Sequence, residues 1–132
     1  MGGLFSLYLA WERPEFARNH AAMSPSIWAT KNLDGDFEMI ERMAKPDPPD
    51  IRLWIDSGTF AAEHQGNDGQ AEVTLACQKL LKNKFELGTN LQHYLDKGAD
   101  HSEVAWSRRL DRVLRYLFQG KLTHSEGNNG IT

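Results

Sequence analysis

The sequence predicts an α/β fold in which helices alternate with short parallel strands. Stretches with apolar residues at helical spacing alternate along the chain with short apolar runs, which is the order of elements in a parallel sheet covered by helices. The strands of such a sheet are joined by right-handed crossovers. The 132 residues suffice for one domain with one core, and no internal repeat divides the sequence. We therefore expect about three parallel strands, with helices on both faces of a single sheet.

Each predicted element has an apolar pattern of its own type and a signal that ends it. The helices carry apolar residues at helical spacing, and the strands are short apolar runs bounded by turn residues. The predicted elements are a helix over residues 3–13, a strand over 20–24, a helix over 37–43, a strand over 51–56, a helix over 71–85, a strand over 91–95 and a helix from residue 103. Pro14 ends the first helix, and the proline-rich run 45–50 ends the second.

Capping residues mark several of the predicted helix boundaries. Asp34 or Asp36 is expected to cap the second helix, because a short carboxylate side chain can accept from the free backbone N–H groups of the first turn. Ser102 is expected to cap the last helix in the same way. Gly88 is expected to stop the third helix, since glycine readily adopts the left-handed conformation that ends helices.

The composition is that of a soluble globular protein. Hydrophobic residues make up 40% and charged residues 25% of the chain, and the formal net charge is −3, so the charge favours neither nucleic acid nor an anionic membrane as a partner. No stretch is long enough to span a bilayer, and a cytoplasmic location is favoured. The single cysteine, Cys77, excludes an intrachain disulfide and is expected to be buried. We predict one domain over residues 1–120 and a flexible tail over residues 121–132.

The loops at the carboxyl ends of the strands are where ligands meet a sheet of this kind. One of them, residues 97–101, presents His101 just before the last helix. Histidine suits acid–base chemistry because its ordinary pKa lies near neutral pH. The histidines form no metal-ligand pattern, and no glycine-rich phosphate loop is present, so neither a metal nor a cofactor is expected.

Three segments resemble one known family. Residues 98–110 read G-A-D-H-S-E-V-A-W-S-R-R-L, residues 22–28 read A-M-S-P-S-I-W, and residues 56–59 read D-S-G-T. The first resembles the pattern G-x-x-H-x-E-x-x-W-x-x-R-L near the end of the putative esterase family, and the second resembles that family's M-S-P-x-x-W segment. The third resembles the glycine turn after its penultimate strand. The family belongs to the α/β-hydrolase superfamily and includes esterase D-like and enterochelin esterase-like enzymes, so the resemblance implies a carboxylic ester hydrolase with an α/β-hydrolase fold.

The first residues resemble part of the same family's nucleophile elbow, which commonly reads G-x-S-M-G-G. Met1-Gly2-Gly3 looks like the second half of this elbow, and no G-x-S-x-G occurs anywhere in the sequence. The resemblance therefore implies a C-terminal part of the domain. The nucleophile serine would stand just before Met1, and the Met1 backbone N–H would form half of the oxyanion hole. On this interpretation the chain alone is inactive as a serine hydrolase.

The resemblance makes His101 the general base, and the imidazole of such a base is oriented by an acidic residue. Family members often carry that acid shortly after the turn glycine, where this chain has Ala61. Three carboxylates remain as candidates, in order of preference Asp68, Glu63 and Asp56. For Asp56, which closes a strand, a structural role is favoured. Trp28 and Trp106 are candidates for the walls of a pocket that takes a small-molecule ester, although a place in the core is favoured for Trp106.

A hypothesis of a different class is a non-catalytic α/β module that binds a partner or a second copy of itself. The first strand would have an unpaired edge, and the helix over residues 4–11 would have an exposed apolar face; surfaces of both kinds promote association. A third hypothesis is a hydrolase that takes its serine from a separate chain.

Overall fold

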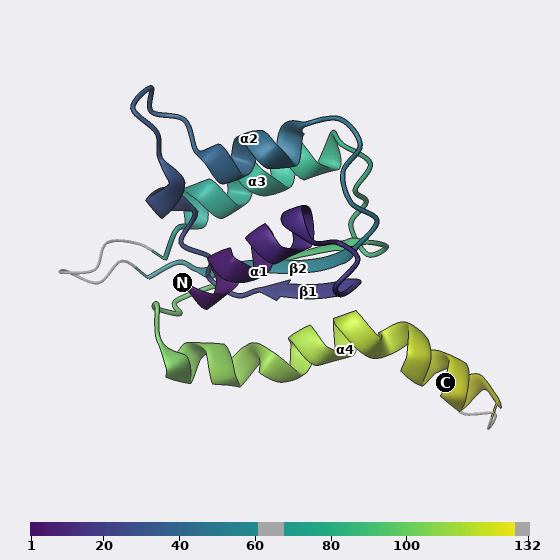
Figure 1. The fold of residues 1–132 in the computed structure, drawn as a ribbon. Coiled ribbons are helices and arrows are strands. Elements are labelled where there is room, and N and C mark those ends of the chain that lie inside the picture. Colours follow the sequence, from purple (N-terminus) through teal and green to yellow (C-terminus); the bar gives the residue numbers. More distant parts are fainter. Residues whose placement is uncertain (61–67, 129–132) are drawn as a thin grey trace.

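The computed structural model describes residues 1–60 and 68–128, and the side chains of the last helix as far as Phe118. Helices and strands alternate along this part of the chain (Figure 1). The elements are α1 (Gly2–Glu12), β1 (Asn19–Ala22), a 3₁₀ helix η1 (Ile27–Thr30), α2 (Glu38–Ala44), β2 (Arg52–Gly58), α3 (Gln70–Leu81), β3 (Leu91–Asp96) and α4 (Glu103–Asn128). This order confirms the predicted α/β fold; only the 3₁₀ helix was not expected.

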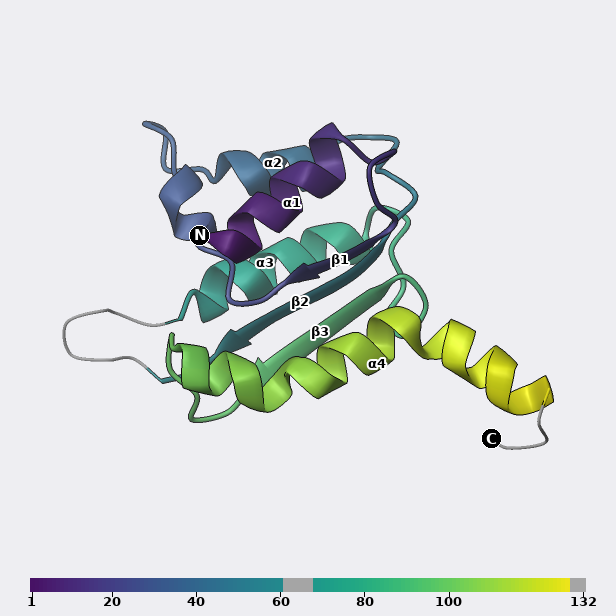
Figure 2. The same cartoon turned by 60° about the horizontal axis from the view of Figure 1, so that its bottom comes forward.

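The three strands form one parallel sheet in the order β1-β2-β3 (Figure 2). Leu53 of the central strand pairs with His20 of β1 on one side and with Leu91 of β3 on the other. Because all three strands run in the same direction, their carboxyl ends meet at one edge of the molecule. β2 also extends further than predicted, since the pairing of Ser57 with Leu95 and of Gly58 with Asp96 carries the strand into the expected turn.

Helices cover both faces of the sheet, with α1, α2 and α3 on one side and α4 on the other (Figure 1). Side chains of a strand alternate between its two faces, so Leu53 and Ile55 of β2 lie in the core beneath the first three helices. Trp54, between them, packs on the opposite face, where its ring centroid lies 6.1 Å from that of Tyr116 on α4. Cys77 on α3 is buried as predicted, and burial raises the pKa of its thiol to about 12.

The predicted capping of α2 by an aspartate is wrong. Phe37 occupies the capping position and its side chain makes no capping hydrogen bond, whereas the Thr30 hydroxyl accepts from the backbone N–H of Met39 in the first turn at 3.3 Å. The turn before it is closed by Asn32 instead, whose side-chain oxygen accepts from the backbone N–H groups of Asp34 (3.0 Å) and Asp36 (2.9 Å). Both aspartates therefore belong to an asparagine-closed turn, a structure that competes with helix capping for the same residue types.

The predicted end of the third helix at Gly88 is also wrong, because α3 already stops at Leu81. The Asn83 side-chain amide donates to the carbonyl oxygens of Met43 and Lys45, at 2.7 Å each. These contacts join the segment after α3 to the end of α2, so the chain leaves the path of the helix at this point. Gly88 does adopt a left-handed φ of 84°, but in the turn before β3.

The cap predicted for the last helix is confirmed, since the Ser102 hydroxyl accepts from the backbone N–H of Ala105 at 3.2 Å. α4 continues to Asn128, and its C-terminal part extends past the sheet (Figure 2). The structure thus places the first eight residues of the expected tail in a helix, residues 129–132 lie outside the described part, and the tail's flexibility stays a prediction. Within the described residues, no helix is long and apolar enough to cross a membrane.

Candidate active site

The carboxyl ends of the strands bring together residues that are far apart in the sequence. His101 lies between β3 and α4, and Asp68 lies just before α3. Nδ1 of the imidazole is hydrogen-bonded to Oδ1 of Asp68. The side chain of Asp68 is fully buried, whereas 38% of the His101 side chain remains exposed. The structure therefore joins the predicted histidine to the first-choice carboxylate and leaves one side of the imidazole open to solvent.

The surroundings of Asp68 determine which tautomer His101 adopts. Oδ2 of the carboxylate accepts from the Ser24 hydroxyl at 2.5 Å and from the Gly58 backbone N–H at 2.6 Å. Both of these groups are donors, and an ionised carboxylate can only accept. The proton of a neutral His101 then lies on Nδ1 and the lone pair lies on Nε2. Such an imidazole can accept a proton at Nε2 while the carboxylate holds the ring.

The loop that carries His101 is fastened to the end of β2. The backbone N–H of Phe60 donates to the carbonyl oxygen of Ala99 at 3.0 Å, and the N–H of Gly98 donates to the Thr59 hydroxyl at 2.7 Å. The approach is so close that a Cβ at Gly58 would overlap the Ala99 carbonyl. The glycine of the D-S-G-T segment therefore permits the contact that positions the histidine loop.

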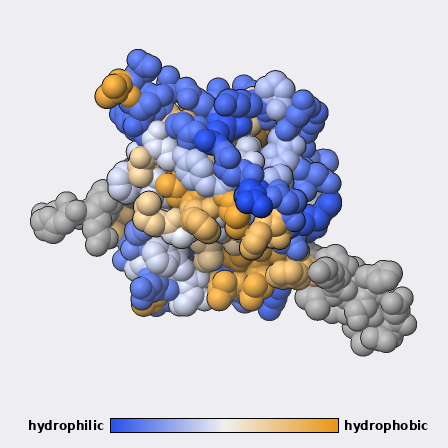
Figure 3. All heavy atoms as spheres, viewed as in Figure 1, coloured by the Kyte–Doolittle hydropathy of each residue, from blue (hydrophilic) through white to orange (hydrophobic). Residues whose placement is uncertain are grey.

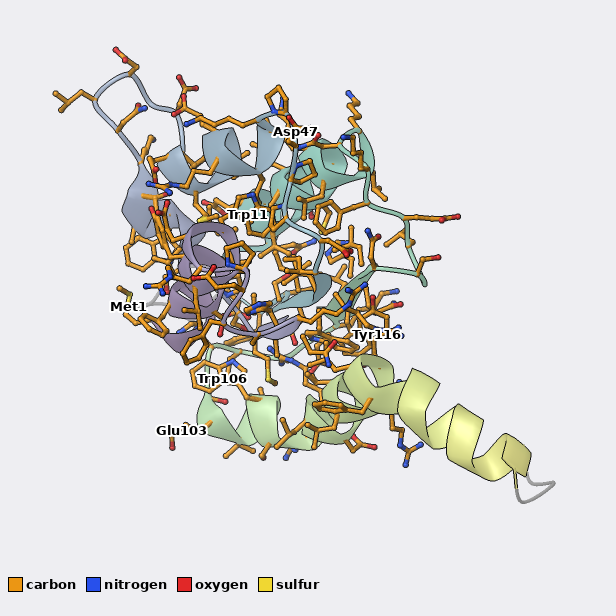
Figure 4. All side chains as sticks on the ribbon, turned by 45° about the vertical axis from the view of Figure 1, so that its right-hand side comes forward. Met1, Trp11, Asp47, Glu103, Trp106 and Tyr116 are labelled. Atoms are coloured by element: carbon orange, nitrogen blue, oxygen red, sulfur yellow. The ribbon has the colours of Figure 1, made fainter. Side chains whose placement is uncertain are left out.

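A pocket of about 390 Å³ opens beside the imidazole. It is lined by Met1, Gly2, Gly3, Ser6, Ala21, Met23, Ser24, His101 and Trp106. Met1 at the start of α1 and Trp106 near the start of α4 lie on the same side of the molecule (Figure 4). The start of α1 also approaches the end of β1, since a Cβ at Gly3 would lie only 2.5 Å from the Met23 carbonyl oxygen. The first residues of the chain and His101 thus share one cavity.

The other predicted site residues have different positions. Trp106 lines the pocket, and its ring lies edge-on to the imidazole of His101 with 4.9 Å between centroids. Trp28 is on η1, is 57% exposed, and is not among the residues that line this pocket. Glu63 lies outside the described residues. In the described part of the chain, no cluster of three or more His, Cys, Asp or Glu side chains is arranged to hold a metal ion.

Asp56, the third candidate acid, contacts an arginine. Arg109 is 1% exposed, and its Nε and Nη2 donate to the two carboxylate oxygens of Asp56 at 2.9 Å each. Nη1 donates to Asp96 at 3.2 Å. Burial by itself lowers the pKa of Arg109, but the hydrogen bonds and charges of Asp56 and Asp96 outweigh it, so the net shift is upward. Asp56 thus has the structural role favoured from the sequence.

Two residues of this region, Ser24 and Arg109, were not predicted to contribute to the site. Arg109 donates to the Ser24 hydroxyl at 2.8 Å, and the Ser24 hydroxyl also contacts Asp68. The sequence did contain a signal for both, because Ser24 belongs to the M-S-P-S-I-W segment and Arg109 to the R-L pair after the histidine. Neither segment by itself indicates that Ser24 and Arg109 are in contact.

Comparison with known proteins gives one match. A family model described as "Putative esterase" matches residues 1–117, which is most of the chain. No curated protein and no solved structure matches the chain. The match includes the first residues, the end of β1 and the histidine loop, which are the segments that surround the pocket. The chain belongs to this esterase family.

Proposed function

We propose that the chain carries the acid–base machinery of a serine-dependent carboxylic ester hydrolase of the α/β-hydrolase type. His101 is the general base, Asp68 orients it, and the nucleophile is a serine that precedes Met1. The observation that carries the proposal is the His101–Asp68 pair beside a cavity that Met1, Gly2 and Gly3 also line. A serine attached to Met1 would enter the cavity from that side. The order serine, acid, histidine along the chain is that of α/β-hydrolases.

The proposed reaction passes one proton through Nε2 of His101. The serine hydroxyl gives its proton to Nε2 while its oxygen attacks the carbonyl carbon of the ester. The backbone N–H of Met1 stabilises the oxyanion that forms. The imidazolium, held by Asp68, then gives the proton to the leaving alcohol as the ester C–O bond breaks, which leaves an acyl-serine. In the second half, a water molecule gives a proton to Nε2 while its oxygen attacks the acyl carbon, and the imidazolium then returns that proton to the serine oxygen as the acyl–serine bond breaks, which releases the carboxylic acid and restores the serine.

Three serines near the pocket are poor candidates for the nucleophile. Ser6 lines the pocket but lies within α1, without the sharp strand-to-helix turn of a nucleophile elbow. The Ser24 hydroxyl is buried and engaged with Asp68 and Arg109, so its proton is already donated to a carboxylate. Ser57 is fully buried within β2 and cannot meet a substrate. These positions favour a nucleophile outside the 132 residues, in agreement with the absence of a G-x-S-x-G motif.

The proposal is tested by ester hydrolysis with and without upstream residues. A form extended into the upstream reading frame, with the elbow complete, is expected to hydrolyse p-nitrophenyl acetate. The change Asp68→Asn in that form is expected to lower the rate about 10³-fold or more, because it removes the carboxylate that orients the base. The chain alone is expected to match the buffer rate. Turnover by the chain alone that disappears in His101→Ala would contradict the proposal.

A non-catalytic interaction module is the second candidate function, and one surface favours it. Among the described residues, β1 pairs only with β2, which leaves its other edge unpaired. Hydrophobic surface extends across this side of the molecule between α1 and α4 (Figure 3). A sheet edge flanked by apolar surface is a common place for a further strand or a second chain to bind.

A further inference from the structure

We propose that Arg109 and Ser24 are positioning residues that fix the Asp68 carboxylate, and through it the tautomer of His101. The catalytic meaning of this inference rests on the proposed function, in which His101 needs a free lone pair on Nε2. The contacts form one continuous path from Arg109 to Ser24, Asp68 and His101.

The chemistry of arginine and of a carboxylate determines the direction of the hydrogen bonds at Ser24. A guanidinium has five N–H donors and no acceptor, so the Ser24 oxygen accepts from Arg109. The single hydroxyl proton of Ser24 is therefore free to point elsewhere, and the acceptor within reach is Oδ2 of Asp68 at 2.5 Å. Without Arg109, the Ser24 oxygen would lose the donor that holds it in place beside Asp68.

Ser24 is held in place at three points. Its backbone N–H donates to Oδ1 of Asp56 at 2.8 Å, and its hydroxyl oxygen bridges Arg109 and Asp68. The residue also has a left-handed φ of 43°, a conformation that is unfavourable for a residue with a side chain and persists where surrounding contacts impose it. The backbone conformation thus directs the hydroxyl toward Asp68 at a strain cost that an ordinary loop serine would not carry.

Two donors on the same oxygen fix the orientation of the Asp68 carboxylate. The Ser24 hydroxyl and the Gly58 N–H both bind Oδ2, which leaves Oδ1 facing Nδ1 of His101. The effect is geometric rather than a matter of long-range charge, because Arg109 already faces the two carboxylates of Asp56 and Asp96. Loss of the Ser24 hydroxyl would leave only the Gly58 N–H on Oδ2 and so weaken the hold on the carboxylate, while the ion pairs of Arg109 stay intact.

The inference is tested by nuclear magnetic resonance of the chain as it stands. Long-range ¹H–¹⁵N correlation spectra distinguish an imidazole protonated on Nδ1 from one protonated on Nε2, and the His101 signals are assigned by their loss in His101→Gln. In the parent chain, His101 is expected to be the Nδ1–H tautomer, with a downfield Nδ1–H proton resonance. In Ser24→Ala, that resonance is expected to disappear through exchange with water, and the Nε2–H fraction is expected to rise severalfold.

Three further variants make the result specific. Ser24→Gly removes the same hydroxyl but suits the left-handed backbone, so it tests the contact without strain. Arg109→Lys keeps the charge but not the fork of donors, and is expected to reproduce the tautomer change. The matched control is Ser107→Ala on α4, whose exposed hydroxyl donates to the Val104 carbonyl instead of to a residue of the path; its His101 signals are expected to equal those of the parent.

Several outcomes would overturn the inference. One is a folded Ser24→Gly chain with the parent tautomer and the parent Nδ1–H resonance. Another is an unfolded Ser24→Gly chain, which would assign Ser24 to stability instead of positioning. A tautomer change in Ser24→Gly but not in Arg109→Lys would remove Arg109 from the path. The spectra read the His101–Asp68 pair directly, so they give the same answer whether or not the chain belongs to a serine hydrolase.

Discussion

Gly58 is the residue whose lack of a side chain matters most for the histidine loop. A Cβ there would overlap the backbone carbonyl of Ala99, and a backbone group cannot move aside as a flexible side chain can. The change Gly58→Ala is therefore expected to lower the free energy of unfolding by about 2–3 kcal/mol, as other overpacked sites do. Urea denaturation measures this change in the free energy of unfolding.

The control for this prediction is Gly2→Ala, because a Cβ at Gly2 would have no neighbour within 4 Å. Gly2 is also in α1, where alanine favours the helix by up to about 1 kcal/mol over glycine. Equal stability for the two variants would mean that the approach of Ala99 to Gly58 is not as close as described.

Arg109 balances a buried carboxylate, and its removal is expected to be costly. In Arg109→Met, Asp56 would stay buried without its bidentate partner, which typically destabilises a protein by about 3–5 kcal/mol. The neighbouring exposed Arg108 provides the control, since Arg108→Met is expected to change the free energy of unfolding by less than about 0.5 kcal/mol. Similar denaturation midpoints for both variants would contradict the described ion pair.

At the scale of single residues, the sequence predicted the candidate histidine and ranked first the carboxylate that contacts it in the structure. It did so because loops at the carboxyl ends of parallel strands meet at one edge. The contact between Ser24 and Arg109 could not be predicted, because the two residues are separated by 85 positions in the chain. A contact of this kind depends on the register and packing of whole elements.

At the scale of elements, β3 contains a titratable group that couples stability to pH. Burial lowers the pKa of His93, although the charge of Asp56 opposes the shift. Below its ordinary pKa near 6.5, the unfolded chain binds a proton that the folded chain does not, so stability falls as the pH falls. The neutral variant His93→Gln is expected to lose less stability between pH 7.5 and pH 5.5 than the parent chain.

Urea denaturation at these two pH values provides the test. Nε2 of His93 is buried and has no hydrogen-bond partner among the described residues, so protonation of this nitrogen would gain no compensating contact. A loss of stability on acidification that is the same in His93→Gln and in the parent would show that other groups account for it.

The existence and type of every α-helix and strand could be predicted from the sequence, but several ends could not. Apolar periodicity is a local property, and it identified the elements correctly. The ends depend on partners elsewhere in the chain: pairing with β3 lengthens β2, and the Asn83 amide bonds to Met43 and Lys45 draw the chain away after α3. A local signal such as Gly88 correctly indicates a turn, but it does not show whether the turn ends a helix or precedes a strand.

At the scale of the whole molecule, the exposed edge of β1 predicts association. We propose that two copies of the chain associate through this edge and the apolar surface beside it (Figure 3). Analytical ultracentrifugation is expected to show a sedimentation coefficient that rises with protein concentration. Ala21→Lys, on β1 itself, is expected to weaken association, since a lysine on an edge strand opposes pairing with a further strand.

The matched control for association is Leu33→Lys, which changes a fully exposed leucine in the loop before α2. It is expected to leave the concentration dependence of the parent chain unaltered. A monomer at all concentrations, or an equal effect of both lysine variants, would show that this surface does not drive self-association.

The central claim is that the chain supplies the base and acid of a serine hydrolase whose nucleophile lies before Met1. The most direct measurement is labelling with a fluorophosphonate probe, followed by mass spectrometry to locate the adduct. Our account predicts no adduct on the 132-residue chain and, in a form extended upstream, one adduct on the serine that precedes Met1, lost in His101→Gln. An adduct on Ser24 or Ser57 of the chain alone, or no adduct on the extended form, would contradict it.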